Sequence, residues 1–282
     1  MKVNECGSVT VYTFEQLAPF DNLLHFVSTR KGGSSDGNFA SLNLGFHVGD
    51  NDFRVLQNRR ALADAVGVDL LQFTLAQQSH SANVAIVDET GRGRGAAEYE
   101  TALPNTDGMV TNAENVCLGV QVADCVPILL YDPVQRVIAA LHAGWKGTLR
   151  KIALAAVNTM RHNYGSRAED IHAGLGPSNG PCCYEVGEDV YRETLMALGP
   201  AAGVAVPAKI PGKYFFDQWK ANARQLKEAG LMHDRIEVAG ICSQCHHDVF
   251  YSSRAGKGIT GRYMAGIMLK KQRQAYHRSK RP

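Results

Sequence analysis

The strongest hydrophobic pattern in the chain is a pair of apolar, β-branched runs separated by a short polar turn. The runs cover residues 116–131 and 136–142, and the turn between them is Asp132-Pro133-Val134-Gln135. Apolar runs on either side of a turn with proline and aspartate are typical of two antiparallel strands. The pattern therefore predicts a β-hairpin.

The open ends of this hairpin hold two side chains that are capable of chemistry. If Tyr131 pairs with Arg136 across the turn, Cys125 lies directly opposite His142. Directly opposed residues have Cβ atoms roughly 4.5–5.5 Å apart. A thiol and an imidazole at that separation can share a metal ion or act as a nucleophile and its base. We therefore expect these two residues to mark the functional site.

The rest of the pattern alternates between helical and extended segments. Asp50 or Asn51 is placed to cap a helix that buries Phe53, Leu56 and Leu62. Helices are predicted over residues 52–66, 148–162 and 218–229, and strands over 24–28, 84–87, 235–241, 249–253 and 263–269. Because strands and helices follow one another without a regular βαβ rhythm, the predicted fold is α+β rather than a doubly wound sheet.

The helix over 148–162 is the most relevant to function, because a glycine-containing turn connects it to His142. That segment is His142-Ala143-Gly144-Trp145-Lys146-Gly147-Thr148, a predicted strand-to-helix turn. The free N–H groups at a helix start favour an anion. Gly165 is expected to end the helix.

Composition and charge narrow the classes of function. The 282-residue chain is 45% hydrophobic and 20% charged, with a formal net charge of +3, which is the balance of an ordinary globular protein. The basic excess lies in residues 270–282, which we expect to be a disordered, solvated tail rather than a nucleic-acid-binding arm. No repeat or linker divides the chain, so residues 1–269 are predicted to form a single catalytic domain.

We expect neither a membrane-spanning segment nor disulfide bonds in this chain. No apolar stretch is long enough to cross a bilayer, and the N-terminus lacks a signal-like apolar segment, so we expect a cytoplasmic protein. Seven cysteines are an odd number in a chain too large to need disulfides, which favours free thiols and metal ligands. No feature of the chain points to a particular oligomeric state.

A third candidate ligand, His80, lies among small polar residues just before a predicted strand. One cysteine and two histidines would give a zinc site with a fourth position open to water or substrate, as in catalytic zinc sites. The spacing also allows another interpretation, in which His80 is a hydrogen-bonded histidine beside an unrelated thiol. Asp124, next to Cys125, either orients a ligand histidine or is a turn residue.

A second cysteine-rich pattern lies nearer the C-terminus. Cys242 and Cys245 form a Cys-x-x-Cys pair, and the vicinal Cys182 and Cys183 could complete a four-ligand structural metal site. Adjacent cysteines rarely direct both side chains at one ion. Ordinary packing thiols and a redox dithiol are therefore alternatives.

Two arginines and one rigid loop are further candidates for a ligand pocket. Arg30 and Arg262 each follow an apolar run, where they could clamp a phosphate or be solvated surface residues. Residues 174–181 are rich in glycine and proline but lack the P-loop and dinucleotide-binding patterns. We interpret that loop as a wall of a pocket.

Seven segments, taken in order, match the motifs of one protein family. They are residues 28–33, 41–50, 78–81, 123–127 (Ala123-Asp124-Cys125-Val126-Pro127), 142–147 (His142-Ala143-Gly144-Trp145-Lys146-Gly147), 176–187 and 260–262. Over nearly its whole length the chain thus resembles the YfiH family, also called polyphenol oxidase or laccase-domain proteins.

The resemblance implies a zinc site made by His80, Cys125 and His142. It also implies a fold of mixed β-sheets covered by helices, layered α/β/β/α and related to cysteine hydrolases. The implied activities are phosphorolysis of adenosine, inosine or methylthioadenosine and deamination of adenosine. Purine nucleoside and phosphate would then be the small-molecule partners.

Within this interpretation, zinc lowers the pKa of a bound water that attacks C6 of adenosine. Phosphate would lie near basic side chains and the helix start at Gly147, and amide side chains would hydrogen-bond the base or ribose. The expected substrate-binding residues are Arg30, Asn43, Gln78, Asp124, Lys146 and Arg262.

The laccase label does not agree with the histidines. A multicopper oxidase needs a dense set of histidines with several His-x-His pairs, whereas this chain has ten histidines and no such pair. A single Cys/His site could still take up copper in a preparation, because copper outcompetes zinc for such ligands.

Two other functions stay open. Cys125 could be a thiolate nucleophile with His142 as its base, cleaving an amide in a peptidoglycan precursor. The protein could also be a non-enzymatic binding module stabilised by zinc, although an open coordination position argues against that.

Overall fold

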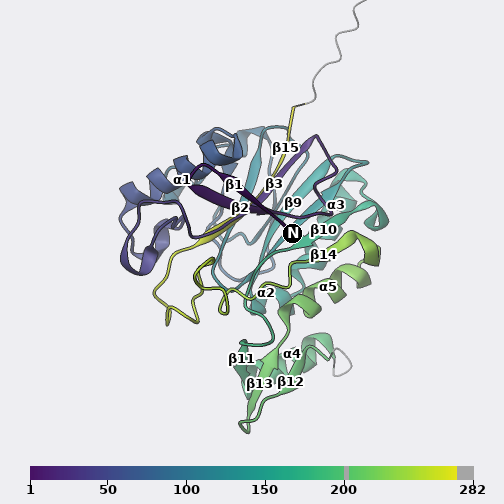
Figure 1. Ribbon diagram of the computed structural model, residues 1–282. Helices are drawn as coiled ribbons and strands as arrows, with labels where there is room; N and C mark the ends of the chain where they lie inside the picture. Colours follow the sequence, from purple (N-terminus) through teal and green to yellow (C-terminus); the bar gives the residue numbers. More distant parts are fainter. Residues whose placement is uncertain (200–202, 272–282) are drawn as a thin grey trace, which may run out of the picture.

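Three β-sheets organise the computed structural model, which describes residues 1–199 and 203–271 (Figure 1). The first sheet has the order β1 (Lys2–Cys6), β2 (Val9–Thr13), β3 (Leu23–Ser28), β15 (Tyr263–Leu269), β7 (Cys117–Val122) and β4 (Phe73–Thr74). The second has the order β14 (Ile236–Val238), β10 (His172–Leu175), β8 (Val126–Asp132), β9 (Val137–Ala143), β6 (Gly108–Thr111) and β5 (Val84–Ile86). The third is β11 (Glu185–Gly187), β13 (Lys213–Phe216) and β12 (Ala205–Pro207).

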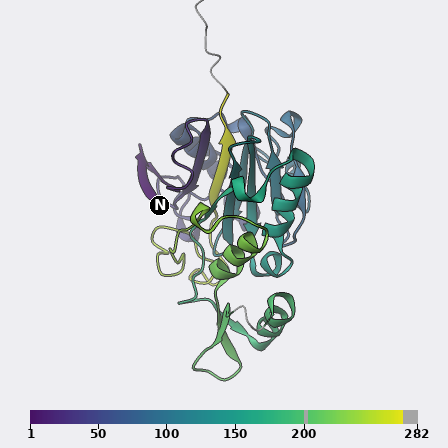
Figure 2. The ribbon, with the colours of Figure 1, turned by 90° about the vertical axis from the view of Figure 1, so that its right-hand side faces the viewer.

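Within the described residues, five α-helices accompany the sheets. They are α1 (Asp52–Val66), α2 (Trp145–Leu149), α3 (Ile152–Tyr164), α4 (Glu188–Leu198) and α5 (Gln218–Glu228). The small third sheet and α4 project from the body formed by the two large sheets, as two perpendicular views show (Figures 1 and 2). No helix in the described part of the chain is long and apolar enough to span a membrane.

The two large sheets pack face to face, and helices cover their outer faces. Between them, alternate residues of β7 and β15 meet alternate residues of β8 and β9, as the two-residue period of a strand requires. The outer face of the first sheet packs on α1, and that of the second packs on α3 and α5. Both faces of β7, β8, β9 and β15 are buried, which explains their continuous apolar runs. The predicted α+β fold of mixed sheets covered by helices is confirmed.

The predicted hairpin is β8–β9, but its register differs from the expected one. Tyr131 pairs with Ile138 rather than Arg136, so Pro127 lies opposite His142. The turn lies one residue later because the Asp132 side chain accepts the backbone N–H groups of two turn residues, and Arg136 adopts a left-handed φ of 54°. A shift of two residues in the pairing keeps each side chain on its face of the sheet.

The helix predicted over 148–162 is two helices instead of one. Lys151 has a left-handed φ of 64° between α2 and α3. In a continuous helix the Thr148 carbonyl would accept the N–H of Ile152, but here it accepts the Gln225 side chain and the Lys151 N–H. Packing against α5 therefore breaks the helix, whereas Gly165 ends α3 as predicted.

The helix α1 has the predicted bounds, with Asn51 as its cap, but its buried face differs from the predicted one. Phe53 is 64% exposed, and the face toward the sheet includes the buried Asn58 and Arg59. The Arg59 guanidinium donates to three backbone carbonyls, so the polar residues are satisfied inside. A hydrophobic pattern cannot register such a face.

The strands predicted over 24–28, 84–87 and 263–269 correspond to β3, β5 and β15, and that over 235–241 shortens to β14. The strand over 249–253 was a wrong prediction. Phe250 and Tyr251 are fully buried there, but the N–H groups of Val249 and Phe250 both turn back to the His246 carbonyl. Of the predicted tail 270–282, the part from residue 272 lies outside the described residues.

Candidate active site

The structure brings His80, Cys125 and His142 together at one end of the hairpin. Cys125 immediately precedes β8, His142 lies on β9, and His80 comes from the loop before β5. The Cys125 Sγ lies 3.8 Å from His80 Nε2. The imidazole rings of His80 and His142 pack edge to face, with their centroids 4.8 Å apart. One ligand atom from each residue lies within 4.8 Å of the others. The three could therefore bind one metal ion.

Asp107 holds both histidines in place. Its carboxylate lies 2.8 Å from His142 Nδ1 and accepts the backbone N–H groups of Ser79, His80 and Ser81. These three bonds define the loop in which His80 adopts a left-handed φ of 59°. Because the carboxylate accepts a hydrogen bond from His142 Nδ1–H, the Nε2 atom of that ring is left for Cys125 or a metal.

Strand pairing positions Asp107 beside His142. β6 pairs with β9 in a register that brings Gly108 opposite Leu141, and the His142 N–H donates to the Asp107 carbonyl. The side chain of Asp107 is 1% exposed. Burial opposes its charge, but hydrogen bonds from His142 and Ser81 hold the pKa of this carboxyl well below its usual range.

Cys125 and His142 form a charged pair in the metal-free protein. Burial alone would raise the pKa of the Cys125 thiol, but the neighbouring His142 and His80 lower it to about 6. Burial also disfavours charge on His142, whereas the Cys125 thiolate and Asp107 raise the pKa of its imidazole to about 9. At neutral pH the pair is therefore a thiolate and an imidazolium.

Gly144 leaves the space that the three side chains occupy. A Cβ atom at this position would lie 2.7 Å from His80 Cδ2 and 3.1 Å from Cys125 Sγ. Gly147 has a similar role, because its Cβ would lie 2.8 Å from the Ser81 carbonyl oxygen. The two glycines therefore let α2 start against the site.

The three residues lie in an open pocket of about 370 Å³. Its walls combine aromatic, amide and basic side chains with one carboxylate. The lining residues are His47, Gln78, His80, Gln121, Ala123, Asp124, Cys125, His142, Trp145, Tyr184, Ser253, Arg254 and Arg262.

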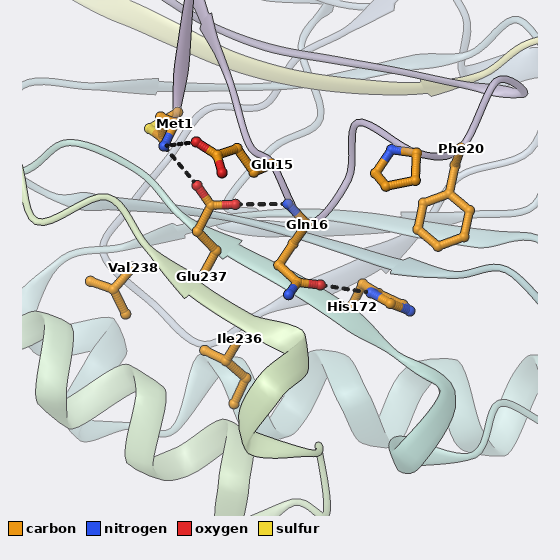
Figure 3. A pocket seen from close by; sticks show the side chains of 9 residues that line it. Met1, Glu15, Gln16, Phe20, His172, Ile236, Glu237 and Val238 are labelled. Carbon is orange, nitrogen blue, oxygen red and sulfur yellow. Dashed lines mark hydrogen bonds and ion pairs between the residues drawn. The ribbon is translucent and has the colours of Figure 1, made fainter.

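A larger hollow of about 610 Å³ lies elsewhere, near the N-terminus (Figure 3). Its polar groups pair with one another: the Met1 ammonium lies 3.0 Å from Glu237, and Gln16 links Glu237 to His172. These groups are engaged in structural contacts, so the pocket around Cys125 is the candidate active site.

Three of the predicted substrate-binding residues line this pocket. Gln78 bonds through its whole amide to the backbone of Gln121. Arg262 donates from one guanidinium nitrogen to two backbone carbonyls. The Asp124 carboxylate accepts the Ser243 hydroxyl and the Arg254 N–H. Asp107, and not Asp124, is the carboxylate that orients His142.

The other three predicted residues lie outside the pocket lining. Arg30 stacks on Tyr251 and donates to two backbone carbonyls. Asn43 is fully buried, and its amide bonds to Gly45, Asp50 and Arg262. Lys146 points to a separate hollow beside α4. The predicted anion site at the helix start is correspondingly weak, because α2 has only five residues.

Several residues that the structure places in or around the site were not predicted from the sequence. They are His47, Asp107, Gln121, Trp145, Tyr184, Ser253 and Arg254. Asp107 left a signal as an aspartate directly before the apolar run of β6, and Trp145 and Tyr184 lie inside the motif segments 142–147 and 176–187. The other residues come from segments whose approach depends on long-range packing.

The fold and the site define a class of α+β protein, with two facing sheets and a Cys-His-His cluster at the mouth of an open pocket. A family described as multi-copper polyphenol oxidoreductase laccase matches residues 24–270. The chain belongs to this family.

Several named relatives agree with the assignment. Purine nucleoside phosphorylase YlmD of Bacillus subtilis is 40% identical over 243 residues, which cover 86% of this chain and 87% of the relative. Adenosine deaminase RL5, from an unknown prokaryotic organism, is 37% identical over 87% of this chain and 93% of its own. The crystal structure of YlmD from Geobacillus stearothermophilus matches with a TM-score of 0.90 and 35% identity over 95% of this chain and 98% of that chain.

Proposed function

We propose that this protein is a zinc-dependent purine nucleoside enzyme. It would cleave adenosine, inosine or methylthioadenosine with phosphate and deaminate adenosine. The observation that supports this most strongly is the convergence of His80, Cys125 and His142 at an open pocket, with Asp107 behind them. The names of the relatives, purine nucleoside phosphorylase and adenosine deaminase, supply the substrate class.

The geometry of the cluster fits zinc. A tetrahedral zinc ion about 2.3 Å from sulfur and about 2.0–2.1 Å from nitrogen places those two ligand atoms about 3.6 Å apart. The Cys125 Sγ and His80 Nε2 are 3.8 Å apart. His142 presents Nε2, because Asp107 accepts from Nδ1, and Cys125 is poised as a thiolate. Three protein ligands leave a fourth position open, as in catalytic zinc sites.

When bound there, zinc would act as a Lewis acid and lower the pKa of a water molecule. His80, Cys125 and His142 would hold it, and Asp107 would keep the His142 ring in the tautomer that can bind. Copper would bind the same ligands in a preparation. Among the described residues, two groups of side chains could hold a metal ion: the Cys-His-His cluster and a group of four cysteines. Neither resembles the histidine-rich centre of a multicopper oxidase.

The walls of the pocket suit a flat base and an anion. Trp145 and Tyr184 line the pocket, and their aromatic rings could contact a purine. Arg254 and Arg262 outnumber the single carboxylate, Asp124, which is already paired with Ser243 and the Arg254 N–H. A phosphate held by the arginines could attack C1′ as the C1′–N9 bond breaks, and the released base takes up a proton. Deamination would instead add water at C6 and release ammonia.

The test is product analysis with adenosine. We expect adenine and ribose 1-phosphate only with phosphate, and inosine and ammonia without it, both lost in Cys125→Ala. Cys6→Ala, which alters a cysteine outside both clusters, is the matched control and should keep both activities. Equal turnover by wild type and Cys125→Ala would refute the proposal.

One observation favours a second candidate function. Cys125, His142 and Asp107 form a nucleophile, base and orienting acid, and the pKa of Cys125 is lowered to about 6. This is the arrangement of a cysteine amidase, for which a peptidoglycan precursor is the proposed substrate. Amide cleavage that survives chelation, with a covalent adduct on Cys125, would establish it. Loss of all turnover on chelation would exclude it.

A further inference from the structure

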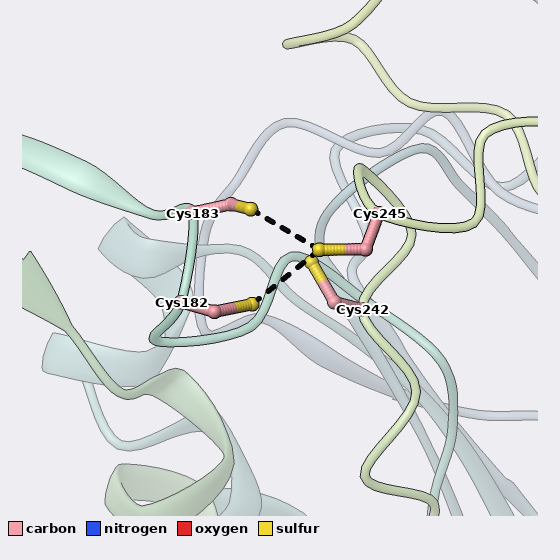
Figure 4. Close-up of side chains that lie close together, drawn as sticks. All are labelled: Cys182, Cys183, Cys242 and Cys245. Atoms are coloured by element: carbon pink, nitrogen blue, oxygen red, sulfur yellow. Dashed lines mark hydrogen bonds between the residues drawn. The ribbon is translucent and has the colours of Figure 1, made fainter.

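Four cysteines from two distant segments of the chain converge beside the pocket. Cys182 and Cys183 precede β11, and Cys242 and Cys245 lie in the loop between β14 and β15. Their four sulfur atoms all lie within 4.8 Å of one another. Figure 4 shows the side chains of the two segments pointing toward each other, with the Cys245 sulfur joined by dashed lines to those of Cys182 and Cys183.

We propose that these four cysteines bind a second zinc ion, in a structural site separate from the Cys-His-His cluster. Tetrahedral coordination with zinc about 2.3 Å from each sulfur places the sulfur atoms about 3.8 Å apart. The Cys245 sulfur lies 3.7 Å from that of Cys182 and 3.3 Å from that of Cys183. A disulfide needs about 2.05 Å, and all four are free thiols. The spacing matches a shared ion.

A tight turn explains how two adjacent cysteines face the same point. The N–H groups of Cys183 and Tyr184 both donate to the Gly180 carbonyl, which closes a single helical turn. Gly180 itself must lack a side chain, because a Cβ there would lie 2.6 Å from the Trp219 ring and 3.2 Å from Cys242 Cβ. The turn therefore overcomes the usual divergence of neighbouring side chains and brings both thiols toward the second segment.

The surroundings of Cys242 suit a thiolate. Its sulfur is buried and accepts the backbone N–H of Gly180 at 3.3 Å. An N–H donor stabilises a negatively charged sulfur, as around metal-bound cysteines.

Asn179 gives an independent indication. Its side chain is fully buried, and its Nδ2 group has no acceptor within the described chain. The Oδ1 atom lies 3.7 Å from the Cys242 sulfur. A half-turn of the amide would direct Nδ2 at that sulfur. A metal-bound thiolate, which accepts but cannot donate, would give this orphan donor its partner.

The site would fasten two walls of the proposed active pocket to each other. Cys183 is followed by Tyr184, and the loop that contains Cys245 continues to Arg254, whose guanidinium lies 5.1 Å from the Tyr184 ring. Asp124, the residue beside Cys125, binds the same loop, because its carboxylate accepts the Ser243 hydroxyl and the Arg254 N–H. A zinc ion at the four cysteines would therefore hold the pocket wall without touching the substrate.

The experiment counts zinc in full-length protein purified with zinc and dialysed against metal-free buffer. We compare wild type with His80→Ala/Cys125→Ser, which removes the first cluster, with Cys242→Ser/Cys245→Ser, and with Cys6→Ser as the matched control. One zinc ion per chain should remain in the His80→Ala/Cys125→Ser variant. Wild type and Cys6→Ser should both exceed Cys242→Ser/Cys245→Ser by one. Equal zinc in wild type and Cys242→Ser/Cys245→Ser, with none left in His80→Ala/Cys125→Ser, would overturn the proposal.

Cobalt gives a readout that does not depend on how the Cys242→Ser/Cys245→Ser variant folds. In the His80→Ala/Cys125→Ser protein, Co²⁺ should produce thiolate charge-transfer bands in the near ultraviolet and intense tetrahedral bands in the visible. Their absence would overturn the proposal, as would an intact mass of the purified protein showing disulfides among these cysteines. If the first cluster bound no metal, wild type and His80→Ala/Cys125→Ser would contain the same amount of zinc. That result would refute the zinc site of the proposed function and not the four-cysteine site, so the two proposals fail separately.

Discussion

Replacing Asp107 with asparagine tests how the site is organised. One carboxylate oxygen of Asp107 serves His142 Nδ1 and the His80 N–H, and the other accepts the N–H and hydroxyl groups of Ser79 and Ser81. An asparagine has a single acceptor oxygen, so one of these two sets faces an NH₂ group instead. The set with more donors should keep the oxygen.

The magnitude follows from that choice. With NH₂ facing His142, Nδ1 must become the acceptor, and the proton moves to Nε2, the atom proposed to bind zinc. Loss of such an orienting partner typically lowers metal affinity 10–100-fold, which corresponds to about 1.4–2.7 kcal/mol. The His80 N–H also loses its acceptor, but His80 is exposed, so water can replace that bond and the destabilisation should be small.

The assay is zinc competition against a chelating dye at neutral pH, with urea unfolding of the metal-free protein alongside. Asp88→Asn is the matched control, because Asp88 is an exposed aspartate whose carboxylate caps a short turn by accepting from the Thr90 N–H and hydroxyl. We expect at least tenfold weaker zinc binding for Asp107→Asn and none of that loss for Asp88→Asn. A folded Asp107→Asn protein that binds zinc within twofold of wild type would refute the reasoning.

Three further predictions rest on separate parts of the structure. Gly144→Ala should lower adenosine turnover at least tenfold while the protein stays folded by circular dichroism, because the new Cβ would lie 2.7 Å from His80 Cδ2; undiminished turnover would show that the site can relax. Arg59→Met should cost about 3 kcal/mol in urea unfolding, because three buried carbonyls lose their donor, whereas the exposed Arg60→Met should change it by less than about 0.5 kcal/mol; equal effects would contradict the buried role. Burial lowers the pKa of the His25 imidazole from 6.5 to about 4. The folded state therefore binds this proton less readily than the unfolded state. The free energy of unfolding should fall as the pH drops from about 6.5 toward 4, by at most about 3 kcal/mol. His25→Gln should lack this part of the loss in unfolding measured at both pH values, and an identical pH dependence in wild type and variant would count against it.

The parts of the fold that could be predicted are those with a local cause. The helix α1 and the strand β15 have the predicted bounds, because their signals are local: a capping residue starts α1, and a continuous apolar run makes up β15. The β8–β9 hairpin was predicted for the same reason. Its predicted register was wrong by two residues, because the side chain of Asp132 and the backbone of Arg136 decide where the turn begins.

The parts of the site that escaped prediction depend on contacts between distant segments. Asp107 reaches His142 only because β6 pairs with β9, with two strands between them in the sequence. Arg254 and Tyr184 meet at the pocket from loops 70 residues apart, a separation that no local pattern encodes. The contacts of Asn43 have the same origin, because its amide bonds to Gly45, Asp50 and Arg262, which come together only in the folded chain.

The most direct test of the central claim is a zinc titration of activity. Chelator-treated protein is given adenosine with and without phosphate, zinc is restored stepwise, and the products are separated by chromatography beside Cys125→Ala. We expect turnover to rise as zinc binds and to stop rising once the site is filled. Adenine should form in the presence of phosphate and inosine in its absence, while Cys125→Ala stays inactive. Full turnover by the zinc-free protein, or turnover by Cys125→Ala equal to that of wild type, would contradict it.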